Sequence, residues 1–104
     1  INVAPGPWER SADGGTLTRF VPIQEIDAYN VDIEGILVYL DHPAVSSSYI
    51  QLPYTYSGET FTYEHLEGGI NLDIQRAEYA TEDPDVPTST LRLNVVLIPS
   101  IDAT

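Results

Sequence analysis

The sequence predicts a single all-β domain over residues 1–104, an antiparallel β-sandwich of about seven to eight strands. Short segments rich in Val, Ile, Tyr, Phe and Thr recur along the chain, and clusters of Gly, Pro, Asn, Asp and Ser separate them. No stretch shows the apolar periodicity of a long amphipathic helix. A chain of this length has room for one domain with one core.

The first part of the chain predicts an entering strand or arm, then a loop and a strand. Residues 1–15 hold Pro, Gly and Asp-Gly turn signals around Trp8, a large aromatic anchor. Residues 17–23 favour a strand that ends at Pro22 or lies at the edge of a sheet, because proline cannot donate a hydrogen bond to a neighbouring strand. The apolar spacing within residues 23–30 suits at most one short helical turn.

Two apolar segments predict buried strands, and the first, which is uninterrupted, predicts the central strand. Residues 36–40 read Ile-Leu-Val-Tyr-Leu, and residues 91–98 form a long final segment before Pro99. Such a run is typical of a strand that is buried on both faces or lies in the middle of a sheet. We therefore expect these two strands to be the most buried of the fold.

Hairpins and one alternating strand complete the expected sheets. We expect residues 49–53 to pair with residues 36–40, and residues 54–56 to pair with residues 60–64 across a Ser-Gly-Glu turn. Residues 70–75 alternate Ile, Leu and Ile with Asn, Asp and Gln. This alternation predicts one face on the core and one face in water.

The charge balance is strongly acidic. Sixteen Asp and Glu face four Arg and no Lys, so the formal net charge is −12. Binding to nucleic acid or to an anionic membrane surface depends on cationic side chains, so we exclude both partners. The acidic surface has two interpretations: a coat that keeps the protein soluble and monomeric, or a halophilic protein whose self-repulsion is screened at a Debye length of about 3 Å near 1 M salt.

The sequence gives no evidence of a redox compartment or of a membrane-spanning segment. The chain has no cysteine, so neither a disulfide nor a thiol nucleophile is available. No apolar run approaches the roughly 18 residues of a membrane span, so we expect no direct membrane insertion. The chain begins at Ile1 rather than Met, and we expect an excised domain or mature product with its targeting segment upstream.

Four motifs in a fixed order carry a resemblance to known proteins. They are Trp8, Gly-Ile-Leu-Val-Tyr-Leu at 35–40, Gln-Leu-Pro-Tyr at 51–54, and Leu-Arg-Leu-Asn-Val-Val-Leu-Ile-Pro at 91–99. Together they resemble uncharacterised β-sandwich domains in secreted proteins and lipoproteins of Bacteroidetes-type bacteria. The resemblance implies a sandwich fold and a secreted or cell-envelope location. It implies no activity and no site residues.

Catalytic motifs are missing from the sequence. His42 and His65 have no partner His at a metal-binding spacing, and no Ser lies in a Gly-x-Ser-x-Gly turn. Paired acids such as Glu9 and Asp13 lie in an expected loop, where a small domain offers little cleft to shift their pKa values. We therefore expect no enzyme activity, no catalytic residues and no cofactor.

An acidic loop is a candidate for metal binding. Residues 81–88 contain two Pro and the acids Glu82, Asp83 and Asp85. Calcium prefers carboxylates and backbone carbonyls, but this loop lacks the ligand order of an EF-hand. A solvated surface loop is the alternative interpretation.

Aromatic residues are the weak candidates for ligand binding. The chain has seven Tyr, two Phe and one Trp, and the candidates are Trp8, Tyr49, Tyr54, Tyr56 and Tyr63. Such amphipathic rings stack on sugars or contact proteins. The alternative is that they pack within the sandwich and pair across strands.

Two functions follow from these observations. The first is a non-catalytic accessory, structural or interaction module of a secreted or cell-surface bacterial protein, whose partner is a protein or a glycan at the cell surface. The second is a carbohydrate-binding type of module that uses exposed Tyr and Trp and a loop-bound calcium. Exposure of the candidate rings favours the second function, and their burial favours the first.

Overall fold

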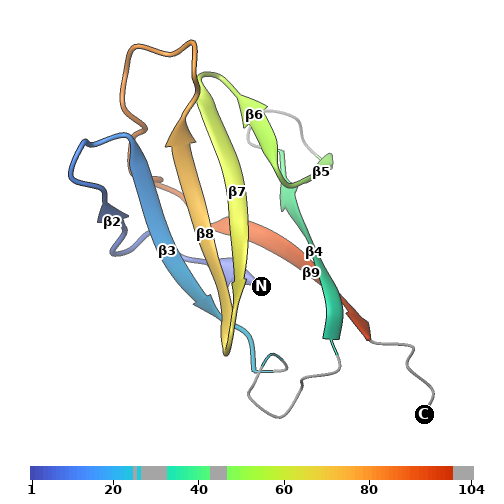
Figure 1. Ribbon diagram of the computed structural model, residues 1–104. Coiled ribbons are helices and arrows are strands. Elements are labelled where there is room, and N and C mark those ends of the chain that lie inside the picture. Colours follow the sequence, from blue (N-terminus) through green and yellow to red (C-terminus); the bar gives the residue numbers. More distant parts are fainter. Residues whose placement is uncertain (25, 27–32, 43–46, 100–104) are drawn as a thin grey trace.

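The computed structural model describes residues 1–24, 26, 33–42 and 47–99, and it confirms the antiparallel β-sandwich (Figure 1). Nine strands are present and no helix occurs in these residues. The strands are β1 (Asn2–Val3), β2 (Glu9–Arg10), β3 (Thr16–Pro22), β4 (Ile33–Asp41), β5 (Tyr49–Gln51), β6 (Tyr54–Tyr56), β7 (Glu59–Leu66), β8 (Gly69–Arg76) and β9 (Leu91–Pro99). The helical turn expected at residues 23–30 falls mostly outside the described residues.

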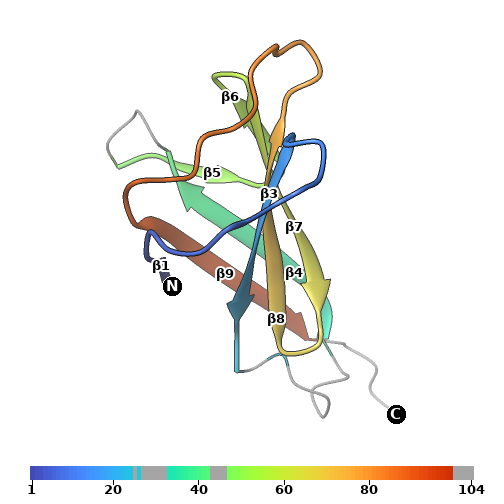
Figure 2. The same ribbon diagram turned by 90° about the vertical axis from the view of Figure 1, so that its left-hand side faces the viewer.

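The strands form two sheets. A four-stranded sheet has the order β1-β9-β4-β5, and a five-stranded sheet has the order β2-β3-β8-β7-β6. Strands of one sheet run obliquely across those of the other (Figure 2). Both expected hairpins, β4 with β5 and β6 with β7, are confirmed. The strands β1 and β2 are only two residues long and lie in the N-terminal arm and loop, and with them the total is nine against the expected seven to eight.

The strand β8 lies at the centre of the five-stranded sheet and is buried on its inner face. Ile70, Leu72 and Ile74 are each at most 1% exposed, and the polar residues between them point outward, which confirms the predicted alternation. A Cβ on Gly69 would lie 2.1 Å from the carbonyl oxygen of Val21, so the close approach of β3 to β8 requires glycine here.

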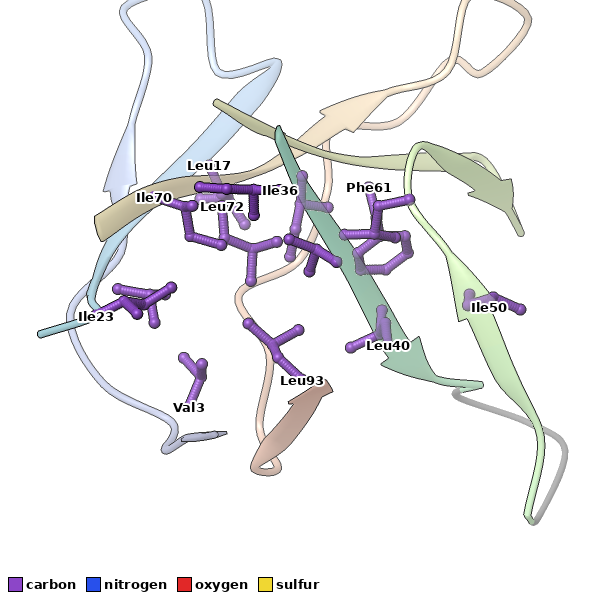
Figure 3. Packing of buried hydrophobic residues seen from close by; sticks show 14 of the residues in the cluster. Val3, Leu17, Ile23, Ile36, Leu40, Ile50, Phe61, Ile70, Leu72 and Leu93 are labelled. Atoms are coloured by element: carbon purple, nitrogen blue, oxygen red, sulfur yellow. The ribbon is translucent and has the colours of Figure 1, made fainter. Parts of the chain in front are cut away.

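The core lies between the sheets and consists of aliphatic side chains with one phenylalanine (Figure 3). Side chains from both sheets point toward one another, and burial of each one contributes about 1.5–3 kcal/mol relative to exposure. The fully buried members are Leu17, Val38, Leu40, Ile70, Leu72, Ile74 and Leu93.

The expectation that residues 91–98 form one of the most buried strands is wrong, whereas residues 36–40 are buried at Ile36, Val38 and Leu40. In β9, Leu93 is 1% exposed, but Val96 and Ile98 on the opposite face are 44% and 39% exposed. These strands do lie in the middle of their sheet. Only one face of that sheet packs on the core. The apolar side chains on the other face of β9 are therefore exposed to solvent.

Candidate functional site

Of the five candidate aromatic rings, only Tyr49 is mostly exposed, at 53%. Trp8, Tyr54 and Tyr63 are half-buried and pack against the core. Tyr56 is also half-buried, and it lies on the same inner face as Tyr54 because the two are separated by two positions on β6. The rings therefore do not form one exposed row, since most of them face the space between the sheets.

The hydroxyl of Tyr63 connects the two sheets. It donates a hydrogen bond to the carbonyl oxygen of Ile36 in β4. The strand β5 pairs with β4 from Tyr39 to Asp41, and the next bond along that edge runs from the Leu52 N–H to the Val38 carbonyl at 2.9 Å. Along this edge of β4, the Ile36 carbonyl comes two residues before the Val38 carbonyl, and Tyr63 is its hydrogen-bond donor. The Tyr63 ring therefore helps to hold the two sheets together.

The ring of Trp8 fixes the N-terminal arm to the side of the sandwich. The guanidinium carbon of Arg19 lies 6.0 Å from the centre of the Trp8 ring, within the range of a cation–π contact. The same guanidinium donates a hydrogen bond to the carbonyl of Ala4. Trp8 Nε1 is buried and has no hydrogen-bond partner among the described residues. The arm, Arg19 and Trp8 therefore form one packed unit.

The end of β4 brings an imidazole and a carboxylate to opposite sides of the four-stranded sheet. His42 contacts the rings of Tyr54 and Tyr56 edge-on, with ring centres 5.9 and 4.9 Å apart. Asp41 Oδ2 lies 3.8 Å from Arg92 Nε, and Asp41 Oδ1 is buried without a hydrogen bond from the described residues. A hollow of about 240 Å³ is lined in part by Asp41, His42 and Arg92, whose side chains can donate or accept hydrogen bonds.

The three acids proposed as metal ligands line a hollow of about 370 Å³ together with Glu59. Asp83 Oδ1 accepts a hydrogen bond from Arg76 at 3.0 Å, so this carboxylate is committed to an ion pair. Burial, and secondly the negative charge of Asp85, raise the pKa of Glu59 above its usual value. Within the described parts of the chain, no three His, Asp or Glu side chains are grouped so that they could hold a metal ion.

A glycine allows the acidic loop to pack closely on the turn between β2 and β3. Gly14 has a φ of 81°, in the left-handed region that favours glycine. A Cβ at Gly14 would lie 2.5 Å from Asp83 Oδ2. In the same turn, the Ser11 hydroxyl and the Gly15 N–H hold the pKa of Asp13 below its usual value. The carboxylates of Asp13 and Asp83 thus both pack against this turn.

Every Arg of the chain has a structural contact. Arg10 donates hydrogen bonds of 2.8 Å to the carbonyls of Gly14 and Pro84, which ties the acidic loop to the β2–β3 turn. The other three contact Asp83, Asp41 and the Trp8 unit, as described above. The few basic side chains are therefore used to hold loops and ends of strands in place.

The outward surface of the four-stranded sheet carries exposed apolar side chains on β9. We call it the open face, and define it by Leu37, Tyr39, Tyr49, Gln51, Asn94, Val96 and Ile98. Leu37 lies directly opposite Val96, and Gly35 lies opposite Ile98. The Ile98 side chain covers the glycine, with its Cδ1 3.7 Å from where a Cβ would stand. These residues form a continuous apolar surface along β4 and β9.

The other end of the open face combines tyrosine with amides. Tyr39 lies between Asn94 on β9 and Gln51 on β5. Tyr49 is two positions from Gln51 on β5, which makes it a diagonal neighbour of Tyr39 on the same side. Sequence reasoning selected Tyr49 but missed the rest of this face. The sequence signal for this face was that apolar residues occur on both sides of β4 and β9.

Comparisons with known proteins give no match to this chain, whether with family models, curated proteins or solved structures. In the described residues, no helix is long and apolar enough to cross a membrane. The surface geometry of the chain is therefore the basis on which a function can be proposed.

Proposed function

We propose that this domain is a non-catalytic interaction module of a secreted or cell-surface protein, and that it contacts other proteins through the open face. The observation that carries the proposal is the exposure of Val96 and Ile98, at 44% and 39%, beside Leu37 in the middle of the sheet. Contiguous apolar surface on a small domain is typical of a contact site. Covering it stabilises a complex by about 25 cal/mol for each Å² of apolar area removed from water.

The other prominent side chains of the molecule have structural roles, which supports the choice of the open face. Trp8 and Tyr63 hold the arm and the two sheets, and the Arg side chains hold loops. The formal net charge of −12 opposes self-association, so a partner with a different charge is a better match than a second copy. The proposed location outside the cell rests on the resemblance of the four ordered motifs to secreted proteins and lipoproteins.

A photo-crosslinking amino acid at Val96 tests the proposal in the cells that produce the protein. We expect covalent adducts with another protein, because position 96 lies in the proposed contact. Gln75 is the matched control, since it is exposed in β8 on the outer side of the five-stranded sheet. Equal adducts at both positions, or none at position 96, would contradict the proposal.

A glycan ligand is the second candidate, and Tyr49 is the observation in its favour. This ring is 53% exposed and shares the open face with Tyr39, Gln51 and Asn94. A sugar ring stacks on an exposed aromatic face while its hydroxyl groups bond to side-chain amides. These residues supply both kinds of contact.

Binding to a panel of cell-surface glycans distinguishes the two candidates. If the ligand is a glycan, Tyr49→Ala abolishes binding, whereas Tyr79→Ala leaves it unchanged. Tyr79 is the control because it is 73% exposed in the loop after β8, away from the open face. Absence of binding by the unmodified domain across the panel would remove the glycan candidate.

A further inference from the structure

A hollow of about 460 Å³ lies beside the outer face of the five-stranded sheet, next to the N-terminal arm. Its lining residues are Pro7, Glu9, Thr18, Arg19, Phe20 and Asn71. They come from the arm and from the strands β2, β3 and β8, which lie side by side in Figure 1. The volume falls within the range of about 300–1,000 Å³ that is usual for small-molecule sites.

The ring of Phe20 is held in place and is still half exposed. Phe20 is next to Val21, which is 3% exposed on the core side, so the Phe20 side chain points outward. Its Cζ lies 3.0 Å from where a Cβ on Gly69 would stand, and 3.8 Å from the same position on Gly68. The tip of the ring thus packs over the start of β8, while 47% of the residue stays exposed. A ring fixed in this way loses little conformational entropy when a ligand covers it.

Polar side chains with unused capacity for hydrogen bonds surround this ring. Asn71 lies directly opposite Phe20 on β8, and among the described residues its side-chain amide makes no hydrogen bond. Thr18 Oγ1 donates its proton to Asp73 Oδ1 at 2.7 Å, so its lone pairs remain able to accept. Glu9 lies opposite Thr18 on β2 and is exposed. The hollow therefore offers an amide donor together with amide, hydroxyl and carboxylate acceptors.

The charge around the hollow determines which ligands it fits. Glu9 and Asp73 are acids, and the whole chain has a formal net charge of −12. The base in the lining is Arg19, whose guanidinium is already engaged by the Ala4 carbonyl and the Trp8 ring. An anionic ligand would be repelled with no free cation to offset the repulsion. A neutral ligand rich in hydroxyl groups avoids this cost, since each hydroxyl both donates and accepts.

We propose that this hollow binds a neutral sugar residue of a glycan, with the sugar ring stacked on Phe20 and its hydroxyl groups bonded to the polar side chains around it. A sugar ring has apolar C–H groups on its faces and hydroxyl groups around its rim, and the hollow presents a matching group to each. The site lies on the opposite side of the sandwich from the open face. It is independent of the protein contact proposed there and of the glycan candidate at Tyr49.

Chemical-shift mapping of the unmodified domain by NMR tests the site. The probes are the methyl glycosides of glucose, galactose, mannose, xylose and N-acetylglucosamine, each titrated alone into the millimolar range. We expect at least one probe to give saturable shifts at Phe20 and at the side-chain amide of Asn71, with Tyr49 and Val96 unchanged. Methyl glucuronide is the matched control for the glucoside, because it adds a carboxylate to the same ring. We expect it to bind several-fold more weakly, with a difference that shrinks as salt screens the charges.

Variants of the two central residues separate the ring from the amide. Phe20→Leu keeps apolar cover over Gly69 but removes the aromatic face, and we expect affinity to fall about tenfold. Phe20→Tyr keeps that face, and we expect affinity to stay within about twofold. Asn71→Ala removes the amide, with an expected loss of about fivefold. Tyr79→Ala, in the loop after β8, is the control that leaves affinity unchanged. The NMR spectrum of each variant reports whether its fold is intact.

Several outcomes would overturn the inference. One is the absence of shifts at Phe20 and Asn71 with every neutral probe. Another is equal affinity of the unmodified domain and a folded Phe20→Leu variant. Equal binding of the glucuronide and the glucoside would contradict the neutral ligand class. Shifts confined to Tyr49 would refute this site and support the glycan candidate on the open face, whereas the protein contact there is decided separately by the crosslinks at Val96.

Discussion

The two outer faces of the sandwich differ in composition although they cover the same core. The outer face of the five-stranded sheet is mostly polar, and its hydroxyls and carboxylates bond to one another. Thr18 Oγ1 donates to Asp73 Oδ1 at 2.7 Å, and Thr55 and Thr60 share a bond of 2.8 Å. The open face of the four-stranded sheet instead exposes Val96 and Ile98. The outer face of the five-stranded sheet exposes one large apolar side chain, Phe20, among polar residues, whereas the open face exposes two neighbouring apolar side chains on one strand.

The largest effect separates the inside of the sandwich from the open face. We expect Leu72→Ala to lower the free energy of unfolding by about 2–5 kcal/mol, because Leu72 is fully buried and its removal leaves a cavity. Val96→Thr keeps the branched shape of an exposed side chain, and we expect a change of less than about 0.5 kcal/mol. Urea unfolding measures both. A loss at Val96 as large as that at Leu72 would show that the open face is covered in the isolated domain.

A smaller effect concerns the contact between the sheets. Tyr63→Phe removes the hydroxyl that bonds to the Ile36 carbonyl, and we expect a loss of about 1–3 kcal/mol because an acceptor in a partly buried place is left unsatisfied. Tyr49→Phe is the matched control on the exposed face, with an expected change within about 0.5 kcal/mol. Thermal or urea unfolding of the two variants gives the comparison. Equal losses would mean that the Tyr63 bond adds nothing to stability.

The smallest effect lies at the charged end of the five-stranded sheet. Burial and the charge of Asp85 raise the pKa of Glu59 in the folded state. The folded protein therefore holds this proton more tightly than the unfolded chain, so Glu59 lowers stability above its folded pKa, and this cost disappears as the pH falls below its unfolded pKa. We expect Glu59→Gln to raise the melting temperature slightly at pH 7, with no difference from the unmodified protein near pH 3. The opposite sign at pH 7 would contradict the assignment.

The sequence predicted the strands better than the surfaces. Alternation in residues 70–75 identified β8 and its buried face, because period two is a local property of a strand. The segment at residues 91–98 identified a strand, but its apolar residues occur on both faces, which does not say whether the second face is covered. That depends on a second layer, which is a property of the whole fold.

The candidate site was predicted only in part, and for a related reason. Tyr49 and Tyr63 look alike in the sequence, and both lie on expected strands. Tyr49 is exposed on the outer side of its sheet, whereas Tyr63 lies between the sheets. The difference arises from strand register and from which sheet each strand joins, and neither is encoded in the neighbouring residues. Val96 and Ile98 were assigned to the core because apolar residues are usually buried.

The bond from Tyr63 to Ile36 also limits how copies of this domain can polymerise. A head-to-tail fibre would require the β9 edge of one copy to pair with the β4 edge of the next. On that edge, Tyr63 and Leu52 already engage the carbonyls of Ile36 and Val38, and β5 takes the positions that follow. An incoming strand must displace these bonds before it can join. The bonds on the β4 edge therefore disfavour a head-to-tail filament of this domain.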